Sequence, residues 1–155
     1  QFIREMQKED EIAVIAFSDQ PHLVTPLAKV RDVGESLAKA VEGLFADGGT
    51  ALYDATLLAL DTIEKSKKDS KEQRLYGVVV LSDGKDTSSR QRLSDLLDRM
   101  PATESADGTR IFTVAYGSEA DEDLMKQVAG RSNAVYSKGD AGNIDKIYHS
   151  ISAYF

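Results

Sequence analysis

Two short segments of this 155-residue chain carry side-chain oxygens in a setting where they could bind a metal ion. Thr50 follows the pair Gly48-Gly49, and Asp83 follows the apolar run 78–81. Paired glycines let the backbone approach a ligand closely, and hydroxyl and carboxylate oxygens suit a hard cation such as Mg²⁺. Because Mg²⁺ keeps several waters and can accept an outside ligand, two protein ligands would make a weak but chemically sensible site.

Each segment also has an ordinary structural interpretation. A threonine at the start of a helix commonly caps that helix, and taken alone this is the favoured reading of Thr50. An Asp-Gly pair after a strand, as at Asp83, is usual turn chemistry. Asp86 is expected to be a solvated loop acid, and residues 86–90 the beginning of a helix. The metal hypothesis therefore depends on the two segments lying together.

Short apolar runs rich in β-branched residues predict the strands that would place these segments. Three such runs are expected to form buried strands, namely residues 12–17, which are unbroken, 78–81 and 111–116. Residues 22–25 follow a turn and are expected to fold back as an antiparallel edge strand, where Pro21 is tolerated. Residues 134–136 are expected to form a short last strand.

Apolar residues at helical spacing predict helices in the first half of the chain. The chain is expected to begin inside a helix, because apolar residues recur over residues 2–6 without a preceding cap. Asp32 and Glu35 resemble a capping box, and Val41 and Leu44 continue a core face with Leu37. That helix is expected to end near residues 47–49.

The same spacing predicts further helices later in the chain. One begins after Thr50 and gives way to a surface loop over residues 65–73, and another covers residues 93–100. Acids at 119–123 suit the N-terminus of the next helix, with Gly130 as its C-cap. Asp140 is expected to cap the last helix, whose core face comprises Ile144, Ile147, Tyr148, Ile151 and Phe155.

Alternating strands and helices of these lengths predict a doubly wound α/β fold: a mostly parallel sheet with helices on both faces and one antiparallel edge strand. One domain, residues 1–155, is expected from the chain length. In such folds ligands bind beyond the carboxyl ends of the strands, where the loops around Thr50 and Asp83 belong.

Composition excludes several classes of function. A net charge of −7 opposes binding to nucleic acid, and no apolar run approaches the length of a membrane span, so no direct membrane insertion is expected. The absence of cysteine excludes disulfides and thiolate chemistry. His22 and His149 are expected to be structural or solvated. No enzyme is predicted, although a phosphate- or nucleotide-handling enzyme that uses Gly48-Gly49-Thr50 as an anion cradle is the alternative.

Residues 47–54 and 80–84 resemble the second and third loops of the metal-ion-dependent adhesion site in von Willebrand factor type A (vWA) domains. The order of elements agrees from Gln1 to the final helix. The resemblance implies a Rossmann-like vWA fold with Thr50 and Asp83 as metal ligands. Residues 113–117 and the ending through Phe155 also resemble vWA modules of bacterial extracellular solute-binding-like proteins. This resemblance implies an extracellular or cell-surface-anchored location, with a cytoplasmic location as the alternative.

The chain departs from the family at its first strand and the Asp-x-Ser-x-Ser loop that follows it, since neither occurs here. In the family this strand is central and would lie between the strands predicted at 12–17 and 78–81. Its absence leaves three possibilities: the strand lies outside this chain, a neighbouring copy supplies one, or the flanking strands close up. We therefore expect self-association through the missing-strand seam, or rearrangement.

The resemblance implies a noncatalytic protein-binding module. A divalent cation, Mg²⁺ or alternatively Ca²⁺ or Mn²⁺, would be held partly by Thr50 and Asp83 and completed by an acidic residue of a protein partner. A scaffold that has lost its metal site is a further alternative. Without the first loop, this chain is expected to bind a cation weakly or not at all.

Overall fold

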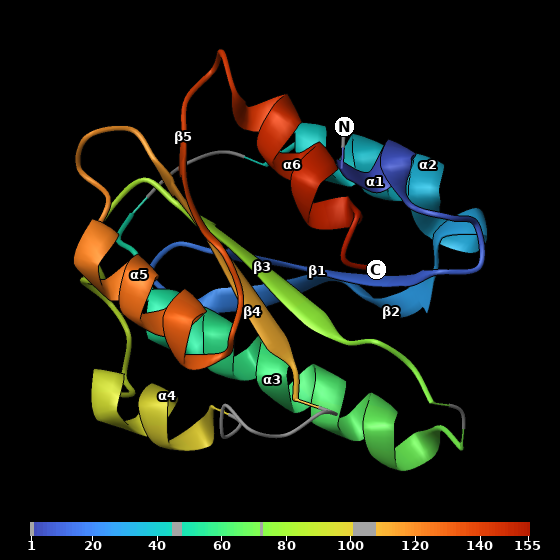
Figure 1. Cartoon of the computed structure of the whole chain (residues 1–155), viewed down its shortest axis with the longest axis horizontal. Coiled ribbons are helices and arrows are strands. Elements are labelled where there is room, and N and C mark those ends of the chain that lie inside the picture. Colours follow the sequence, from blue (N-terminus) through green and yellow to red (C-terminus); the bar gives the residue numbers. More distant parts are fainter. Residues whose placement is uncertain (1, 45–47, 72, 101–107) are drawn as a thin grey trace.

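The computed structural model describes residues 2–44, 48–71, 73–100 and 108–155. Strands form a central layer with helices on both sides (Figure 1). No helix among these residues is long and apolar enough to cross a membrane. The elements follow in the order α1 (Phe2–Glu5), β1 (Glu11–Phe17), β2 (Pro21–Lys29), α2 (Val30–Glu42), α3 (Leu52–Asp69), β3 (Gly77–Ser82), α4 (Leu93–Arg99), β4 (Arg110–Tyr116), α5 (Glu122–Arg131), β5 (Tyr136–Gly139) and α6 (Ile144–Ser152).

Strands β3, β4 and β5 form a parallel sheet in that order, as the alternation of strands and helices predicts. β4 is the central strand, and its alternate residues face opposite layers. Ile111 and Ala115 pack in the cluster formed with α3, α4 and α5, whereas Phe112 and Val114 pack with Ile151 of α6. The predicted doubly wound α/β class, with helices on both faces, is therefore confirmed.

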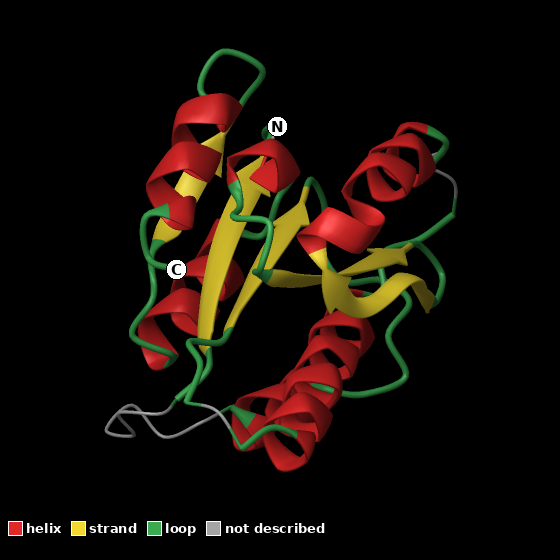
Figure 2. Cartoon of the chain, turned by 90° about the vertical axis from the view of Figure 1, so that its right-hand side faces the viewer, coloured by secondary structure: helices red, strands yellow, loops and turns green. Residues whose placement is uncertain are grey.

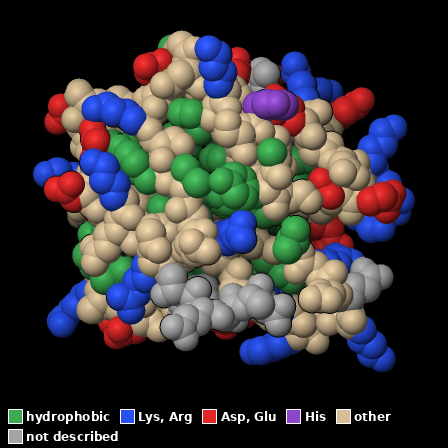
Figure 3. All heavy atoms as spheres, in the orientation of Figure 1, with side chains coloured by type: hydrophobic (Ala, Val, Ile, Leu, Met, Phe, Trp, Pro, Cys, Tyr) green, Lys and Arg blue, Asp and Glu red, His purple; other side chains and the backbone are tan. Residues whose placement is uncertain are grey.

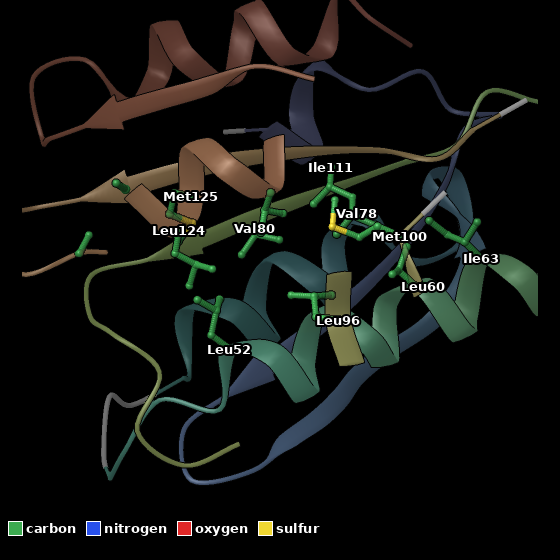
Figure 4. Packing of buried hydrophobic residues seen from close by; sticks show 13 residues of the cluster. Leu52, Leu60, Ile63, Val78, Val80, Leu96, Met100, Ile111, Leu124 and Met125 are labelled. Carbon is green, nitrogen blue, oxygen red and sulfur yellow. The ribbon is translucent and has the colours of Figure 1, made fainter. Parts of the chain in front are cut away.

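The larger core lies between the parallel sheet and α3, α4 and α5. Figure 4 shows Leu52, Leu60 and Ile63 of α3 directed toward Val78 and Val80 of β3. The apolar stripe predicted for α3 is the reason, since these leucine and isoleucine positions recur on one helical face. The carboxyl ends of β3 and β4 are thereby fixed over the N-terminal end of α3.

Strands β1 and β2 pair antiparallel in a sheet of their own, which confirms the predicted hairpin. Figure 2 shows this pair lying across the direction of the three parallel strands. β1 and β3 are not hydrogen-bonded to each other, so within the described residues each has one edge without a partner strand. The two flanking strands have not closed up. α3 packs against both sheets and joins them.

The prediction that residues 12–17 are buried on both faces is wrong in this structure. Every residue of β1 is only half-buried, although the strand is as apolar as β4. On β3, Leu81 remains 39% exposed. Hydrophobic side chains are visible near the middle of the molecule in Figure 3. The composition of β1 predicts an interior strand, but within the described residues one of its edges has no partner strand.

The outer and inner sheet edges differ in composition. β2 contains Pro21 and Pro26, and β5 is only four residues long and contains Lys138. Prolines, lysines and short length are common protections against unwanted strand pairing. The inner strand β1 carries none between Ile12 and Phe17. We conclude that its open edge has the chemistry of a strand that normally has neighbours on both sides.

Several predicted helix boundaries are wrong. α2 begins at Val30 after Lys29, with no side-chain cap, so Asp32 and Glu35 do not form its capping box. It ends at Glu42 rather than near residues 47–49, with Gly48 six residues farther on. Val41 and Leu44, expected in the core, are 40% and 41% exposed. Only Leu37 of that predicted face is fully buried.

Other boundaries shift because propensity and packing extend or shorten the element. α3 continues to Asp69 through part of the predicted loop 65–73, since lysines are good helix formers and favour the C-terminal turn. Gly130 lies inside α5 and is not its C-cap, which is Ser132. β5 begins two residues later than predicted. The N-cap of α6 is Asn143 rather than Asp140, and Phe155 lies beyond the helix and is exposed.

Candidate functional site

Thr50 lies two residues before the start of α3 and does not cap it. The N-cap position is Ala51, and no side chain of that position bonds the helix. The backbone of Thr50 is bonded on both sides: its N–H donates to Thr87 Oγ1 at 2.9 Å, and its carbonyl accepts from Thr87 N at 2.9 Å and Ser88 N at 3.2 Å. Its hydroxyl has no hydrogen-bond partner among the described residues. The capping interpretation is therefore wrong.

Asp83 follows β3 and is exposed. Its carboxylate makes no hydrogen bond or ion pair with any residue that the structure describes. The neighbouring Gly84 lies beside the other predicted ligand, since a Cβ built on Gly84 would be 3.4 Å from Thr50 Oγ1. The fold thus brings the two predicted segments together at one edge of the sheet and leaves both ligand side chains uncommitted.

Asp19 is a third oxygen-bearing residue at this edge. Its Oδ1 accepts the backbone N–H of Gly49 at 2.6 Å and the hydroxyl of Ser88 at 3.4 Å. Gly48 adopts φ +82°, and a Cβ there would lie 2.7 Å from Asp19 Oδ2. The glycine pair therefore lets the backbone approach this carboxylate. Sequence reasoning missed Asp19, although it follows β1 just as Asp83 follows β3.

The segment after Asp83 does not begin a helix, and Asp86 is not a solvated acid. Asp86 Oδ2 accepts the N–H of Tyr53 at 3.0 Å, and Ser89 Oγ accepts the N–H of Asp54 at 3.0 Å. These two amides belong to the first turn of α3, which Ala51 cannot cap. The helix is therefore capped by side chains that lie more than thirty residues after the amides they bind.

The same contacts weigh against an anion cradle. The N–H groups of Gly49, Thr50 and Tyr53, which would have to bind a phosphate, already donate to Asp19, Thr87 and Asp86. Two of these acceptors are carboxylates. The pKa of the Tyr53 hydroxyl is raised by burial and then by the charges of Asp86 and Asp121. This negative surrounding repels phosphate and suits a cation.

The oxygen atoms at this edge are of the chemical types that bind a hard cation. Thr50 and Asp83 offer uncommitted oxygens, and Asp19, Thr87 and Ser88 lie in the adjoining loops. Such hydroxyl and carboxylate oxygens are what Mg²⁺ and Ca²⁺ bind. The described residues contain no group of three or more acidic, histidine or cysteine side chains placed to hold a metal. Within the described residues, the candidate ligands at this edge are thus Thr50 and Asp83, with Asp19 beside them.

Comparison with known proteins supports the same family assignment. The family model for the von Willebrand factor type A domain matches residues 1–150. An uncharacterized Synechocystis protein, sll0103, is 26% identical over 135 residues, which is 87% of this chain and 30% of that protein. The chain therefore spans less than a third of that relative.

Solved structures share the fold. A von Willebrand factor type A protein from Catenulispora acidiphila superposes with a TM-score of 0.80 at 18% identity, covering 98% of this chain and 35% of that one. BatB from Bacteroides thetaiotaomicron gives 0.71 at 14% identity, with 98% and 80% covered. Proximal thread matrix protein 1 from the mussel byssus, with a zinc-occupied adhesion-site motif, gives 0.67 at 15% identity, with 99% and 37% covered. The chain belongs to the von Willebrand factor type A domain family, a family of protein-interaction modules.

Proposed function

We propose that this chain is a noncatalytic protein-binding module in which Thr50 and Asp83 hold a divalent cation, and that a carboxylate of a partner protein completes its coordination. One observation carries the proposal. The Thr50 hydroxyl and the Asp83 carboxylate are free of hydrogen bonds to described residues, whereas the nearby Asp19, Asp54 and Asp86 each accept backbone amides. Uncommitted oxygens in adjoining loops are available to an ion.

A cation at this edge would change which partners the protein can bind. With a net charge of −7, the protein repels acidic groups at long range. A bound divalent ion is the largest local charge in its surroundings and attracts a carboxylate directly. The proposed partner is therefore a protein that presents an exposed aspartate or glutamate, and the contact requires the ion.

The unpaired edges of β1 and β3 leave a place for a further strand, whose following loop could add ligands to the ion. A strand placed between them would end near the loops of Asp19 and Asp83, because β1 and β3 both end at that edge of the molecule. An Asp-x-Ser-x-Ser loop after such a strand would add one carboxylate and two hydroxyls. We propose that the full affinity requires these additional ligands, and that the described residues alone bind the ion weakly.

Calorimetric titration with Mg²⁺ tests the proposal. It should be performed on this chain and on a longer polypeptide that adds a strand and an Asp-x-Ser-x-Ser loop. In the longer protein, Thr50→Ala and Asp83→Ala should each weaken Mg²⁺ binding about tenfold or more, the scale on which metal sites respond to lost interactions. Unchanged affinity in both variants would remove Thr50 and Asp83 from the site.

Matched controls use the same residue types away from this edge. Thr62→Ala removes a hydroxyl that bonds Leu58 O within α3, and Asp98→Ala removes an exposed carboxylate on α4. Neither should change the Mg²⁺ affinity. A carboxylate-bearing peptide should then bind the longer protein only with Mg²⁺ present. Peptide binding that is equal in excess chelator would favour a metal-free scaffold.

A further inference from the structure

The N-terminus of α3 is capped from a distant part of the chain. A helix begins with amides that lack intrahelical acceptors, and Ala51 at the N-cap has no oxygen to offer them. Asp86 accepts the Tyr53 amide and Ser89 accepts the Asp54 amide, both at 3.0 Å. The first turn of α3 therefore depends on the loop that follows β3.

The dependence is mutual, because α3 also binds the backbone of that loop. Asp54 Oδ2 accepts the N–H of Arg90 and Asp54 Oδ1 accepts the N–H of Gln91, both at 2.9 Å. Ser89 Oγ donates to Asp86 Oδ2 at 2.6 Å while it accepts from Asp54 N. The serine thus links Asp54 and Asp86. Asp54 binds the backbone of the loop that carries Asp86, and Asp86 binds the backbone of the helix turn that carries Asp54.

These reciprocal contacts lie next to the candidate site in both loops. Between the two aspartate contacts, Thr87 and Ser88 bind the backbone of Thr50 from both sides. Asp83 lies three residues before Asp86 in the same loop. A short loop held at Asp86 and again at residues 90–91 has little freedom to move relative to α3. The position of Asp83 relative to Thr50 is therefore fixed by side chains that are not themselves candidate ligands.

We infer that Asp54, Asp86 and Ser89 are positioning residues, which act as one unit to hold the loop of Asp83 against the loop of Thr50. The inference rests on the proposed function of Thr50 and Asp83. It adds that the affinity of the site is set partly by this reciprocal capping. Local capping of α3 by a residue at position 51 would satisfy the helix equally well, but it would leave the two loops joined only through the contacts of Thr87 and Ser88 with Thr50.

The test compares Asp54→Ala, Asp86→Ala and the double variant, with Ser89→Ala as a milder change. Amide hydrogen exchange by NMR reports the loops without any metal. Each single variant should accelerate exchange at Thr50 by several-fold to about tenfold, as expected from losing a helix-capping interaction. Because the residues act as one unit, exchange at Thr50 should be only slightly faster in the double variant than in either single variant. The backbone resonances of Gly84 should shift in Asp54→Ala, although Asp54 does not contact it.

Asp140→Ala is the matched control. The Oδ1 atom of Asp140 accepts two backbone amides, from Gly142 at 2.7 Å and Asn143 at 3.0 Å, as Asp54 does, but it precedes α6. This variant should leave exchange at Thr50 and the resonances of Gly84 as in the wild type. The Mg²⁺ affinity should be measured in whichever polypeptide binds the ion more tightly, this chain or the longer one. It should fall about tenfold in Asp86→Ala and stay unchanged in Asp140→Ala.

The outcomes separate this inference from the proposed function. If the wild type binds Mg²⁺ and Asp86→Ala changes neither exchange at Thr50 nor affinity, the positioning role is overturned while the function stands. If exchange accelerates but affinity is unchanged, the contacts only cap the helix, and the role is again overturned. If no protein binds Mg²⁺, the proposed function fails. Faster exchange at Thr50 and shifted Gly84 resonances would then still support the coupling of the two loops.

Discussion

Asp19 Oδ1 accepts the backbone N–H of Gly49 at 2.6 Å, across thirty residues of sequence. The contact requires that the chain at Gly48 and Gly49 carry no side chain. A Cβ on Gly49 would lie 2.9 Å from both Asp19 Oδ1 and Thr87 Oγ1, and would also overlap Ser88 Oγ. The end of β1 is thereby bound to the segment that leads into α3.

Gly48→Ala should therefore destabilise the protein. Gly48 has φ +82°, where an L-residue is strained, and its Cβ would lie 2.7 Å from Asp19 Oδ2. The expected loss is about 1–3 kcal/mol of the free energy of unfolding, measured by urea denaturation. Gly130→Ala is the control, because that glycine lies inside α5 with open space around its Cα. It should stabilise by about 0.5–1 kcal/mol. Equal effects of the two substitutions would contradict this account.

Glu122 should make stability depend on pH in the acid range. Hydrogen bonds from Lys138 Nζ at 2.6 Å and from the Tyr136 hydroxyl at 2.9 Å lower the pKa of this carboxyl to about 2. A carboxyl whose pKa is lower in the folded state contributes stability above its unfolded pKa, near 4.5, and loses it as pH falls toward 2. Solvent screening keeps the effect small because the side chain is partly exposed.

Urea denaturation between pH 2 and 7 measures this contribution. The wild type should lose more stability between pH 4.5 and 2 than Glu122→Gln, so the two curves should converge at the acid end. Glu35→Gln removes a carboxylate that has no hydrogen-bond partner among the described residues, and its curve should run parallel to the wild type. A constant difference between wild type and Glu122→Gln across this range would show that these contacts do not favour the charged form.

The open edge of β1 should make the 155-residue chain associate. Its apolar, half-buried strand has no protective proline or lysine between Ile12 and Phe17, and such edges pair with other chains. Sedimentation equilibrium should show a mean mass that rises with concentration, and a hydrophobic dye should bind. Val14→Lys should weaken association about tenfold or more, because two copies would bring like charges together.

Leu23→Lys is the control for the seam. Leu23 is 45% exposed on β2, whose outer edge is already protected by Pro21 and Pro26. The substitution adds the same charge and removes a similar apolar side chain, but it should change neither association nor dye binding much. A monomeric wild type of ordinary stability that binds no dye would overturn the prediction.

The parts of the fold that depend on local pattern could be predicted from the sequence. Residues 111–116 are apolar apart from Thr113 and form most of β4, which is buried on both faces. The stripe from Leu52 to Ile63 predicts the face that α3 presents to the sheet. β1 has the same local chemistry as β4 yet is only half-buried, because burial depends on neighbours that its own residues cannot specify.

The candidate site was predictable only in part, for a similar reason. Thr50 and Asp83 can be proposed from the sequence because each follows a recognisable local signal, a glycine pair or a buried strand. The roles of Asp54 and Asp86 depend on contacts between residues more than thirty positions apart, and no spacing rule connects them. Ala51 is the available signal, because an N-cap without a side-chain acceptor leaves the first amides of the helix to water or to acceptors elsewhere in the chain.

Ser132 should be important for stability but not for the site. β5 begins at Tyr136 and pairs with β4 only from Thr113 onward, so it cannot accept the N–H of Ile111. Ser132 Oγ accepts that buried N–H at 2.9 Å from the end of α5. Ser132→Ala leaves the amide without an acceptor, and such a buried unsatisfied group costs about 1–3 kcal/mol. Urea denaturation should show this loss, while Ser150→Ala, which removes an exposed hydroxyl on α6, should change stability by less than about 0.5 kcal/mol.

Amide exchange at Thr50 under native conditions should keep its wild-type rate in Ser132→Ala if that amide exchanges through local opening of the loop. Acceleration there equal to the loss of global stability would instead mean that the loop opens only when the whole domain unfolds.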